Sequence, residues 1–426
     1  MALEDYRNDM MRCVRCSSCK FIPLGSIVKS WQFAYGCPAS KQMNFHSYSG
    51  SGKLIAALSW LDGRIGVTPE LLDVVYRCSL CGLCDVSCRM GTDMEVYEIL
   101  HQLRKKLVAE GHGPMPAHKP VIESVRNYDN VWVQPRNRRG RWAKGLSVKD
   151  LSKGKEKAEV LYFVGCTYSY ASDLMHIPRL TAELFTRAGV DFGILGAREL
   201  CCASPVYMVG QQDLYEEYAK KNIAMFNELG VKKVVTSCAG CYGVFRSKYP
   251  LLGEDMDFEV VHAEEYLAEL IGSGALVPKN KVDLSVTFHD PCHTGRMAEI
   301  RAPSGGGEEC HLGCLPVKNV EKVLGFDGSY DAPREILAAI PQMKFSEMER
   351  IREYSFCCGS GGGAKSAFPD FALSAASDRV EEAMSTGAEA LVTNCPWCEK
   401  NFADAVRETG APIRVVDTIE LLAQSL

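Results

Sequence analysis

The chain has 426 residues, a formal net charge of −5, and hydrophobic and charged contents of 46% and 24%. These values are ordinary for a soluble protein of two or three domains and do not indicate nucleic-acid binding. No apolar run approaches the ~20 residues that cross a bilayer, and the acidic N-terminus does not resemble a signal peptide. We therefore expect a cytoplasmic protein with no transmembrane segment of its own, which docks, if anywhere, on a membrane partner.

Twenty cysteines is a high count for such a chain. In a reducing compartment, clustered C-x2-C spacings favour metal sites over disulfide bonds. Zinc sites usually pair two C-x2-C knuckles, whereas triple C-x2-C-x2-C runs suit iron–sulfur clusters. The spacing therefore predicts iron–sulfur sites, with zinc as the alternative.

Eight cysteines in the first 88 residues form two sets. One set reads Cys13-x2-Cys16-x2-Cys19 followed by Cys37, and the other reads Cys78-x2-Cys81-x2-Cys84-x3-Cys88. They resemble the two-cluster bacterial ferredoxin pattern, in which the fourth cysteine of each run ligates the other cluster. The resemblance implies two [4Fe–4S] cubanes, one at Cys13, Cys16, Cys19 and Cys88 and the other at Cys37, Cys78, Cys81 and Cys84.

Helical patterns separate and follow these cysteines. Thr68-Pro69 is typical of a helix start, with Thr68 as N-cap. Residues 54–61 and 94–107 show helical periodicity. We therefore predict an α-helical ferredoxin domain with two [4Fe–4S] clusters over residues 1–110.

Residues 111–158 are predicted to be a linker, because glycines and prolines interrupt regular structure there. A basic run within it could bind a phosphate or an acidic partner, but a solvated linker is the simpler interpretation, and we assign it no function. The run consists of Arg136, Arg138, Arg139, Arg141 and Lys144.

Five cysteines recur in the same order in the second half of the chain. The gaps read C-x34-CC-x35-C-x2-C and C-x64-CC-x36-C-x2-C. The first set is Cys166, Cys201, Cys202, Cys238 and Cys241, and the second is Cys292, Cys357, Cys358, Cys395 and Cys398. Short β-branched runs precede each C-x2-C, and helical stretches at 214–229 and 371–386 precede those runs. This pattern predicts an internal duplication of an α/β unit.

The predicted units cover residues 159–275 and 282–426, so the whole chain is expected to be an α+β multidomain protein. The longer gap in the second unit predicts a surface insertion at 297–329. Within it, Cys310 and Cys314 could add metal ligands or redox thiols, but two free cysteines in a docking loop are the simpler interpretation. The run Gly359–Gly363 matches neither the G-x-G-x-x-G dinucleotide-binding motif nor the phosphate-binding P-loop. We therefore expect these glycines to let the backbone pass close to a bulky cluster.

Adjacent cysteines place two thiolates at one point of the backbone, which suits neighbouring irons better than one tetrahedral ion. Five thiolates also exceed the four that a cubane needs. Either one thiol is a spare redox group, or the cluster is unusual. His289 and His293 flank Cys292 and are expected either to relay a proton or to form local hydrogen bonds.

The five-cysteine sets, with His289-Asp290-Pro291-Cys292-His293 and Cys357-Cys358-Gly359, resemble the CCG-domain (cysteine-rich domain) family. With the N-terminal module, nearly the whole chain is similar to the D subunit of heterodisulfide reductase and to electron-transfer subunits of class II benzoyl-CoA reductase complexes. The resemblance implies a non-cubane [4Fe–4S] cluster at each five-cysteine set. The first set has Ala203 where glycine is usual, and its methyl group is expected to crowd the cluster.

The resemblance implies an iron–sulfur electron-transfer subunit of a multi-subunit anaerobic oxidoreductase complex. Its expected partners are a flavoprotein or another iron–sulfur subunit, or alternatively a membrane cytochrome. The alternative function is a terminal heterodisulfide reductase that reduces a small disulfide at the second five-cysteine set. A structural zinc protein or metal-dependent regulator is a third hypothesis, from another class.

Overall fold

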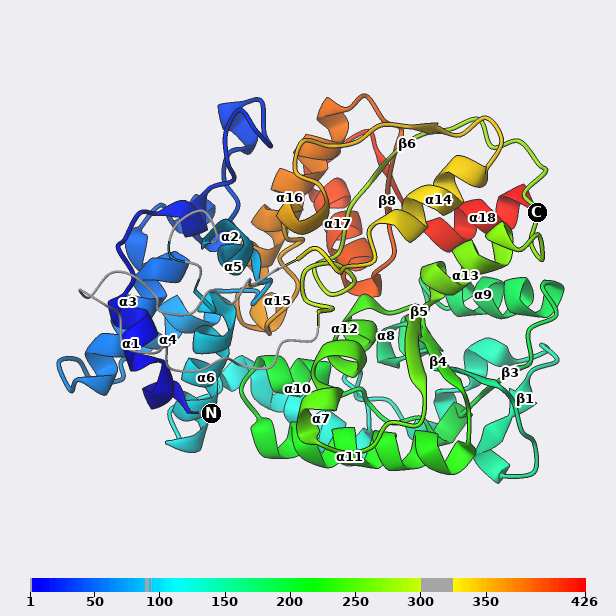
Figure 1. The fold of residues 1–426 in the computed structure, drawn as a ribbon, viewed down its shortest axis with the longest axis horizontal. Coiled ribbons are helices and arrows are strands. Elements are labelled where there is room, and N and C mark those ends of the chain that lie inside the picture. The colour runs from blue at the N-terminus through cyan, green and yellow to red at the C-terminus, as the bar shows by residue number, and fades with distance from the viewer. Residues whose placement is uncertain (1, 89–91, 93, 300–324) are drawn as a thin grey trace.

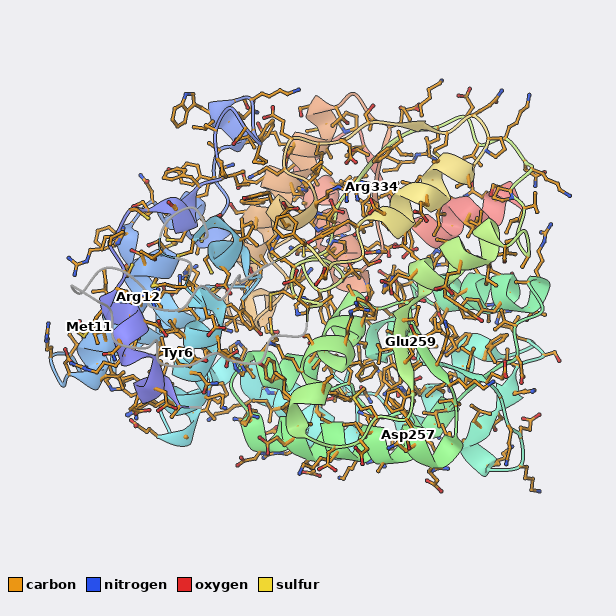
Figure 2. The ribbon with its side chains drawn as sticks, in the orientation of Figure 1. Tyr6, Met11, Arg12, Asp257, Glu259 and Arg334 are labelled. Carbon is orange, nitrogen blue, oxygen red and sulfur yellow. The ribbon has the colours of Figure 1, made fainter. Side chains whose placement is uncertain are left out.

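The computed structural model describes residues 2–88, 92, 94–299 and 325–426. Cys310, Cys314 and most of the insertion predicted at 297–329 lie outside the described residues. The chain forms a helical N-terminal region followed by two parallel β-sheets with their helices (Figure 1). Tyr6 and Arg12 lie at the end of the molecule opposite to Glu259 (Figure 2).

The N-terminal region is helical, as its sequence pattern predicts. At one of the predicted helix starts, the Thr68 side chain accepts a hydrogen bond from the Leu71 backbone at 3.3 Å, which satisfies a free N–H group of the first turn. The α-helices of this region are α1 (Arg7–Met11), α2 (Pro38–Met43), α3 (Gly50–Leu61), α4 (Pro69–Tyr76), α5 (Leu83–Cys88) and α6 (Val96–Ala109).

The segment predicted to be a linker is more structured than its sequence suggests. It contains α7 (Lys119–Tyr128) and the short strand β1 (Lys149–Asp150), which pairs in parallel with β3 (Phe192–Ile194). Trp142 is buried and its ring lies 5.9 Å from that of Tyr162 in an edge-to-face arrangement. Part of this segment therefore packs onto the first sheet.

Two sheets of the same topology follow. The first has the order β1-β3-β2-β4-β5 and the second β7-β6-β8-β9, and every pairing is parallel. Without the edge strand β1, the two orders correspond strand for strand. The other strands are β2 (Val160–Tyr162), β4 (Lys233–Thr236), β5 (Glu259–His262), β6 (Ser285–Phe288), β7 (Lys344–Phe345), β8 (Ala390–Thr393) and β9 (Arg414–Asp417). The predicted duplication of an α/β unit is therefore present.

The helices alternate with the strands, as parallel connections require. The first repeat contains α8 (Cys166–Tyr170), α9 (His176–Arg187), α10 (Ser204–Met208), α11 (Gln212–Leu229), α12 (Ala239–Ser247) and α13 (Ala263–Gly272). The second contains α14 (Asp331–Ala339), α15 (Ala364–Ala367), α16 (Pro369–Ser385), α17 (Pro396–Thr409) and α18 (Thr418–Ser425). Helices α13 and α9 pack against α14 and α18, so the two repeats face each other through these helices (Figure 1).

One buried core joins the N-terminal region to the first repeat and includes a few residues of the second, such as Ile336 and Phe371. The rest of the second repeat has two buried clusters of its own. Central strands β2 and β8 are buried along their whole length, as expected for parallel strands covered on both faces. Helix α2 packs against α16, which joins the N-terminal region to the second repeat. Within the described ranges we find no helix that combines the length and the apolarity needed to cross a membrane.

Candidate metal centres

The outer N-terminal set gathers three of its four predicted members. The Cys19 thiol is buried, which raises its pKa to about 11, and the neighbouring Cys88 and Cys13 thiols act in the same direction. Cys16 is exposed and donates to Ser18 Oγ at 3.2 Å. The outer set therefore lies at the protein surface.

The inner N-terminal set encloses a small cavity between helices. This cavity is lined by all four predicted members, Cys37, Cys78, Cys81 and Cys84. A Cβ atom on Gly50 would lie 3.2 Å from Cβ of both Cys19 and Cys84, so glycine leaves room between the two sets. The structure thus places Cys37 with the Cys78 run, as the ferredoxin-like pattern implies.

The first five-cysteine set lies at the carboxyl ends of the strands of the first sheet. Cys166 begins α8 after β2, and Cys238 is the N-cap of α12 after β4. Contacts run from Cys166 to the adjacent pair and on to Cys241 and Cys238. Hydrogen bonds from Cys201 and Cys241 lower the pKa of the Cys202 thiol to about 6, which favours the thiolate that binds metal.

The second set repeats this order of contacts. Cys292 contacts Cys357 of the adjacent pair, Cys358 contacts Cys398, and Cys398 contacts Cys395. The Cys358 and Cys398 sulfur atoms are 3.1 Å apart. All five side chains of each set therefore converge on one place in their own repeat.

Ala203 fits its position and does not disturb the geometry of the first set. Its backbone N–H donates to Cys201 Sγ at 3.4 Å, and the Gly359 N–H donates to Cys357 Sγ at the same distance. Ala203 adopts the left-handed φ of 62° that glycine would tolerate more easily. In the described structure its methyl group leaves the arrangement of the five cysteines like that of the second set.

The two sets line one cavity of about 150 Å³ between the repeats. Cys238 of the first set and Cys395 of the second are close enough for each thiolate to disfavour the other. His293 lies between the repeats, where an added Cβ on Gly243 would meet its carbonyl oxygen at 2.8 Å. Nine of the ten cysteines face this cavity, namely Cys166, Cys201, Cys202, Cys238, Cys241, Cys292, Cys358, Cys395 and Cys398.

The remaining member, Cys357, faces the N-terminal region instead. It donates to Ser79 Oγ at 3.2 Å and contacts the Cys81 thiol, and this contact lowers the pKa of Cys81 to about 6. Cys81 belongs to the inner N-terminal set. The inner set and the second five-cysteine set are therefore in direct side-chain contact.

Arg296 adds a positive charge at this junction. Its guanidinium is buried, donates from Nε to the Cys81 carbonyl at 2.6 Å, and lies near the thiols of Cys292 and Cys357. A positive charge in a low-dielectric region favours the thiolate forms of the neighbouring cysteines. His293 contributes in the same way, because its Nδ1 lies 3.3 Å from Cys292 Sγ and helps to lower the pKa of that thiol.

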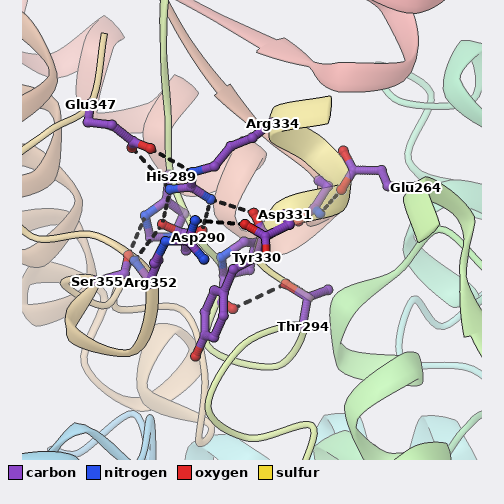
Figure 3. A network of polar contacts seen from close by, with 12 residues as sticks. Glu264, His289, Asp290, Thr294, Tyr330, Asp331, Arg334, Glu347, Arg352 and Ser355 are labelled. Atoms are coloured by element: carbon purple, nitrogen blue, oxygen red, sulfur yellow. Dashed lines mark hydrogen bonds and ion pairs between the residues drawn. The ribbon is translucent and has the colours of Figure 1, made fainter. Parts of the chain in front are cut away.

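The loop that carries Cys292 is held by an ionic network (Figure 3). Arg334 binds both carboxylate oxygens of Asp290, at 2.7 and 3.0 Å, and also pairs with Glu347. The Arg352 backbone N–H donates to Asp290 at 2.8 Å. This network fixes the residues between β6 and Cys292.

Sequence reasoning missed the buried arginines of these sites, and Arg139 and Arg104 are two examples besides Arg296. Arg139, in the basic run interpreted as a solvated linker, is only 2% exposed and pairs with Glu199 at 2.8 Å. Arg104 is fully buried in α6 and donates to the carbonyls of Met208, Gly362 and Cys78 at 2.7 to 2.9 Å. A lone arginine in a charged run or an amphipathic helix carries no sequence signal that distinguishes it from a surface residue.

The glycines after Cys358 have a steric reason in addition to the one predicted. An added Cβ on Gly361 or Gly362 would lie 2.8 Å or closer to the backbone of Cys78 and Ser79, and one on Gly363 would lie 2.5 Å from His118. These glycines let the second repeat approach the backbone of the N-terminal region. Gly361, Gly362 and Gly363 also line the cavity between the repeats.

The donor sets fit iron–sulfur clusters. None of the described cysteines forms a disulfide, and nine of the ten cysteines in the two five-cysteine sets are buried. A Cβ on Gly165 would lie 3.0 Å from Cys241 Sγ, so glycine keeps the space beside the first set open. Buried thiolates without a counter-ion are costly, and bound iron would compensate them.

Family models match most of these regions. The cysteine-rich domain (CCG) model matches residues 160–246 and 309–403, and the 4Fe-4S dicluster domain model matches residues 9–92. The second CCG match begins after Cys292, so it does not bear on that residue. The cysteine-rich repeats and the N-terminal cluster-binding region are thus each identified by a family model.

Several known proteins are similar to the chain. The D subunit of dihydromethanophenazine:CoB–CoM heterodisulfide reductase from Methanosarcina mazei is 33% identical over 421 residues, which cover 97% of this chain and 93% of that protein. The probable iron-sulfur-binding oxidoreductase FadF of Bacillus subtilis is 31% identical, covering 89% of this chain and 50% of that protein. EtfAB:quinone oxidoreductase of Syntrophomonas wolfei is 28% identical, covering 83% and 47%.

One solved structure shares the fold. A hypothetical protein from Helicobacter pylori aligns with a TM-score of 0.51 at 9% sequence identity, covering 88% of this chain and 68% of that one. At this identity the likeness concerns the fold alone.

Proposed function

Because the chain belongs to the CCG-domain family of iron–sulfur oxidoreductases that includes the D subunit of heterodisulfide reductase, we propose that it is the electron-transferring subunit of a larger redox complex. Two [4Fe–4S] cubanes in the N-terminal region and one non-cubane [4Fe–4S] cluster in each repeat would supply its one-electron chemistry. The domain limits given above, with a ferredoxin domain over 1–110 and CCG units over 159–275 and 282–426, are part of this proposal.

The contact between Cys81 and Cys357 carries the proposal. It joins the inner N-terminal set to the second five-cysteine set without an intervening residue. The outer set lies at the surface, where Cys16 is exposed, and Cys19 adjoins both Cys13 of the outer set and Cys37 of the inner set. The four sets therefore form a series from the surface to the cavity.

Each set has its own ligands in this proposal. The outer cubane would be held by Cys13, Cys16, Cys19 and Cys88, and the inner one by Cys37, Cys78, Cys81 and Cys84. The first repeat would use Cys166, Cys201, Cys202, Cys238 and Cys241, and the second Cys292, Cys357, Cys358, Cys395 and Cys398. Arg296 and His293 stabilise the thiolate forms at the second repeat.

The partner is expected to be another subunit that exchanges single electrons at the outer set. A flavoprotein or a further iron–sulfur subunit fits this role, and a membrane cytochrome is the alternative. The relatives support a redox partner, since one is named as a subunit of a reductase and another as an EtfAB:quinone oxidoreductase. The net charge of −5 offers no support for a nucleic-acid partner.

A second candidate function is favoured by the cavity between the repeats. Sulfur atoms of both five-cysteine sets face it, so a small disulfide could be reduced there to two thiols. The balanced reaction is R–S–S–R′ + 2 e⁻ + 2 H⁺ → R–SH + R′–SH. The electrons would come from the N-terminal side, and His293 is placed to supply a proton near Cys292.

Anaerobic isolation of the native assembly distinguishes these functions. Co-purification with a flavoprotein or a further iron–sulfur subunit, and no turnover of disulfides by the chain alone, is the result expected for the relay. Disulfide reduction by the isolated chain with a reduced dye would assign the terminal reductase instead. A protein with zinc and no iron would contradict both.

A further inference from the structure

His289 is a fully enclosed imidazole beside the second five-cysteine set. It follows β6 directly, is 1% exposed, and packs edge-to-face on Phe402 with ring centroids 4.8 Å apart. One ring nitrogen of His289 and the sulfur atoms of Cys358 and Cys398 all lie within 4.8 Å of one another. By composition alone, one histidine and two cysteines could be taken for three ligands of one metal ion.

The hydrogen bonds of His289 argue against ligation. Arg379 Nε lies 3.1 Å from Nδ1, and a guanidinium has only donors, so Nδ1 must present its lone pair. Because Nδ1 must accept from Arg379, the ring cannot carry a proton on both nitrogen atoms and is therefore neutral. A neutral imidazole that accepts at Nδ1 carries its proton on Nε2. Nε2 therefore has no lone pair to offer to iron.

Arg379 itself is held in place by other buried charges. It pairs with Glu382, which is fully buried and also binds Arg350 at 2.9 Å. Ser355 Oγ lies 3.5 Å from the same Nδ1 atom (Figure 3) and accepts from Arg379 at 3.3 Å. This arrangement fixes the tautomer, because a proton on Nδ1 would face the Nε–H donor of Arg379.

The remaining ring nitrogen points to the sulfur atoms. Nε2 is buried and, among the described residues, has no hydrogen-bond partner within the chain. Because Arg379 and Ser355 occupy Nδ1, Nε2 is the ring nitrogen left to face the sulfur atoms beside this ring. We propose that His289 donates a hydrogen bond from Nε2 to the Cys358 sulfur, is not an iron ligand, and thereby distinguishes the second CCG site from the first.

The first repeat provides the comparison. Phe163 occupies the equivalent place, because its backbone N–H donates to Val235 at 2.8 Å just as that of His289 donates to Val392. Phe163 has no polar hydrogen and packs against Phe245 at 4.9 Å between ring centroids. The first site instead receives a donor from Arg139, whose charge Glu199 balances.

The functional consequence concerns the reduction potential of the second site. A hydrogen bond to a cluster sulfur stabilises the more negative, reduced state and raises the reduction potential. His289 therefore raises the potential of the second site, which adjoins Cys81. This inference rests on the proposed function, since it needs a cluster at the second site.

Three variants test the inference by redox titration followed by electron paramagnetic resonance (EPR). His289→Asn keeps an acceptor for Arg379 but loses the donor at the Nε2 position, so the second CCG signal should shift to lower potential with iron content unchanged. His289→Gln restores a donor at that position, and its potential should return towards that of the wild type. His262→Asn changes a buried histidine of the first repeat whose Nε2 faces the Ser237 carbonyl, and it should leave this signal in place.

Pulsed EPR on protein labelled with 15N-histidine shows whether His289 is a hydrogen-bond donor to the cluster or an iron ligand. Weak nitrogen coupling in the wild-type protein is expected, and the strong coupling of a directly coordinated imidazole would overturn the inference. An unchanged potential in His289→Asn would overturn it as well. If His289→Asn fails to fold, the wild-type coupling and the His289→Gln potential decide. Absence of any CCG signal in the wild type would overturn the proposed function, and this inference with it.

Discussion

Arg139 Nη2 donates to Cys166 Sγ at 3.5 Å, and through this bond the segment between the two halves of the chain contacts the first five-cysteine set. The same guanidinium binds Glu199, whose carboxylate also accepts the backbone N–H groups of Val164 and Gly165. Arg139 thus fixes the strand end from which Cys166 projects. Because Arg139 and Glu199 together carry no net charge, this ion pair does not balance the negative charge that a cluster at the first set would carry.

We expect Arg139→Met to destabilise the first repeat by about 3–5 kcal/mol, because Glu199 stays buried without its partner. Anaerobic thermal unfolding followed by circular dichroism measures the loss. The exposed Arg141 belongs to the same basic run, and Arg141→Met should stay within about 0.5 kcal/mol of the wild type. Equal effects of the two substitutions would show that the buried pair has no special role.

Arg104→Met removes a buried cation from the neighbourhood of Cys78. The substitution leaves several buried carbonyls without a donor, at roughly 1–3 kcal/mol each, and should lower the reduction potential of the inner cubane. Arg104→Lys keeps the charge with fewer donors, so it should be destabilised while its potential stays near that of the wild type. If the reduction potential also falls in Arg104→Lys, which is destabilised but keeps the positive charge, the electrostatic explanation is contradicted.

Iron analysis of cysteine variants tests the ligand sets. Cys358→Ser and Cys292→Ser should each lose about a quarter of the iron, since one of four clusters disappears, while the cubane signals remain. Cys310→Ser is the matched control, because this cysteine lies in the predicted insertion and should keep all iron. If Cys310→Ser loses iron and Cys292→Ser does not, the first ligand of the second set is Cys310 in the insertion and not Cys292.

The interface between the repeats should make stability depend on pH. Burial raises the pKa of Glu264 to about 8, and this side chain accepts a hydrogen bond from Asn394, next to Cys395. An acid whose pKa is higher in the folded state binds its proton more tightly there, so stability is full below the ordinary pKa of 4.5 and falls as pH rises towards 8.

Glu264→Gln keeps the neutral shape and should lose less stability than the wild type between about pH 5 and about pH 9. The decline should become smaller but not vanish, because burial also raises the pKa of Asp417 to about 7. The loss of stability is measured as the difference between the thermal unfolding midpoints at the two pH values, and Glu408→Gln, at an exposed position, is the control. Parallel declines in the wild type and in Glu264→Gln would contradict the assignment.

Much of the architecture could be predicted from the sequence, because its signals are local. Thr68-Pro69 marks a helix start, and the repeated cysteine spacing reveals two parallel units with equivalent sheets. Proximity within each cysteine set also follows from the spacing, since parallel strands bring their carboxyl ends together. These features depend on residues that are neighbours in the chain.

The features that could not be predicted depend on contacts between distant segments. Nothing near Arg139 in the sequence points to Cys166, and the tautomer of His289 depends on Arg379, 90 residues away. The approach of Gly361 and Gly362 to the backbone of Cys78 and Ser79 likewise has no local signal in the sequence. Such pairs become visible only when the repeats and the N-terminal region are placed together.

The close approach of Gly362 to Cys78 has a consequence for the biogenesis of the protein. Residues of the second repeat, which are translated after the first, cover the loop that carries Cys78, and Gly362 leaves no room there for even a methyl group. A nascent chain that has reached only the first repeat therefore leaves this loop uncovered. We expect any cluster of the inner set to be inserted before the second repeat closes over the loop, or as it closes.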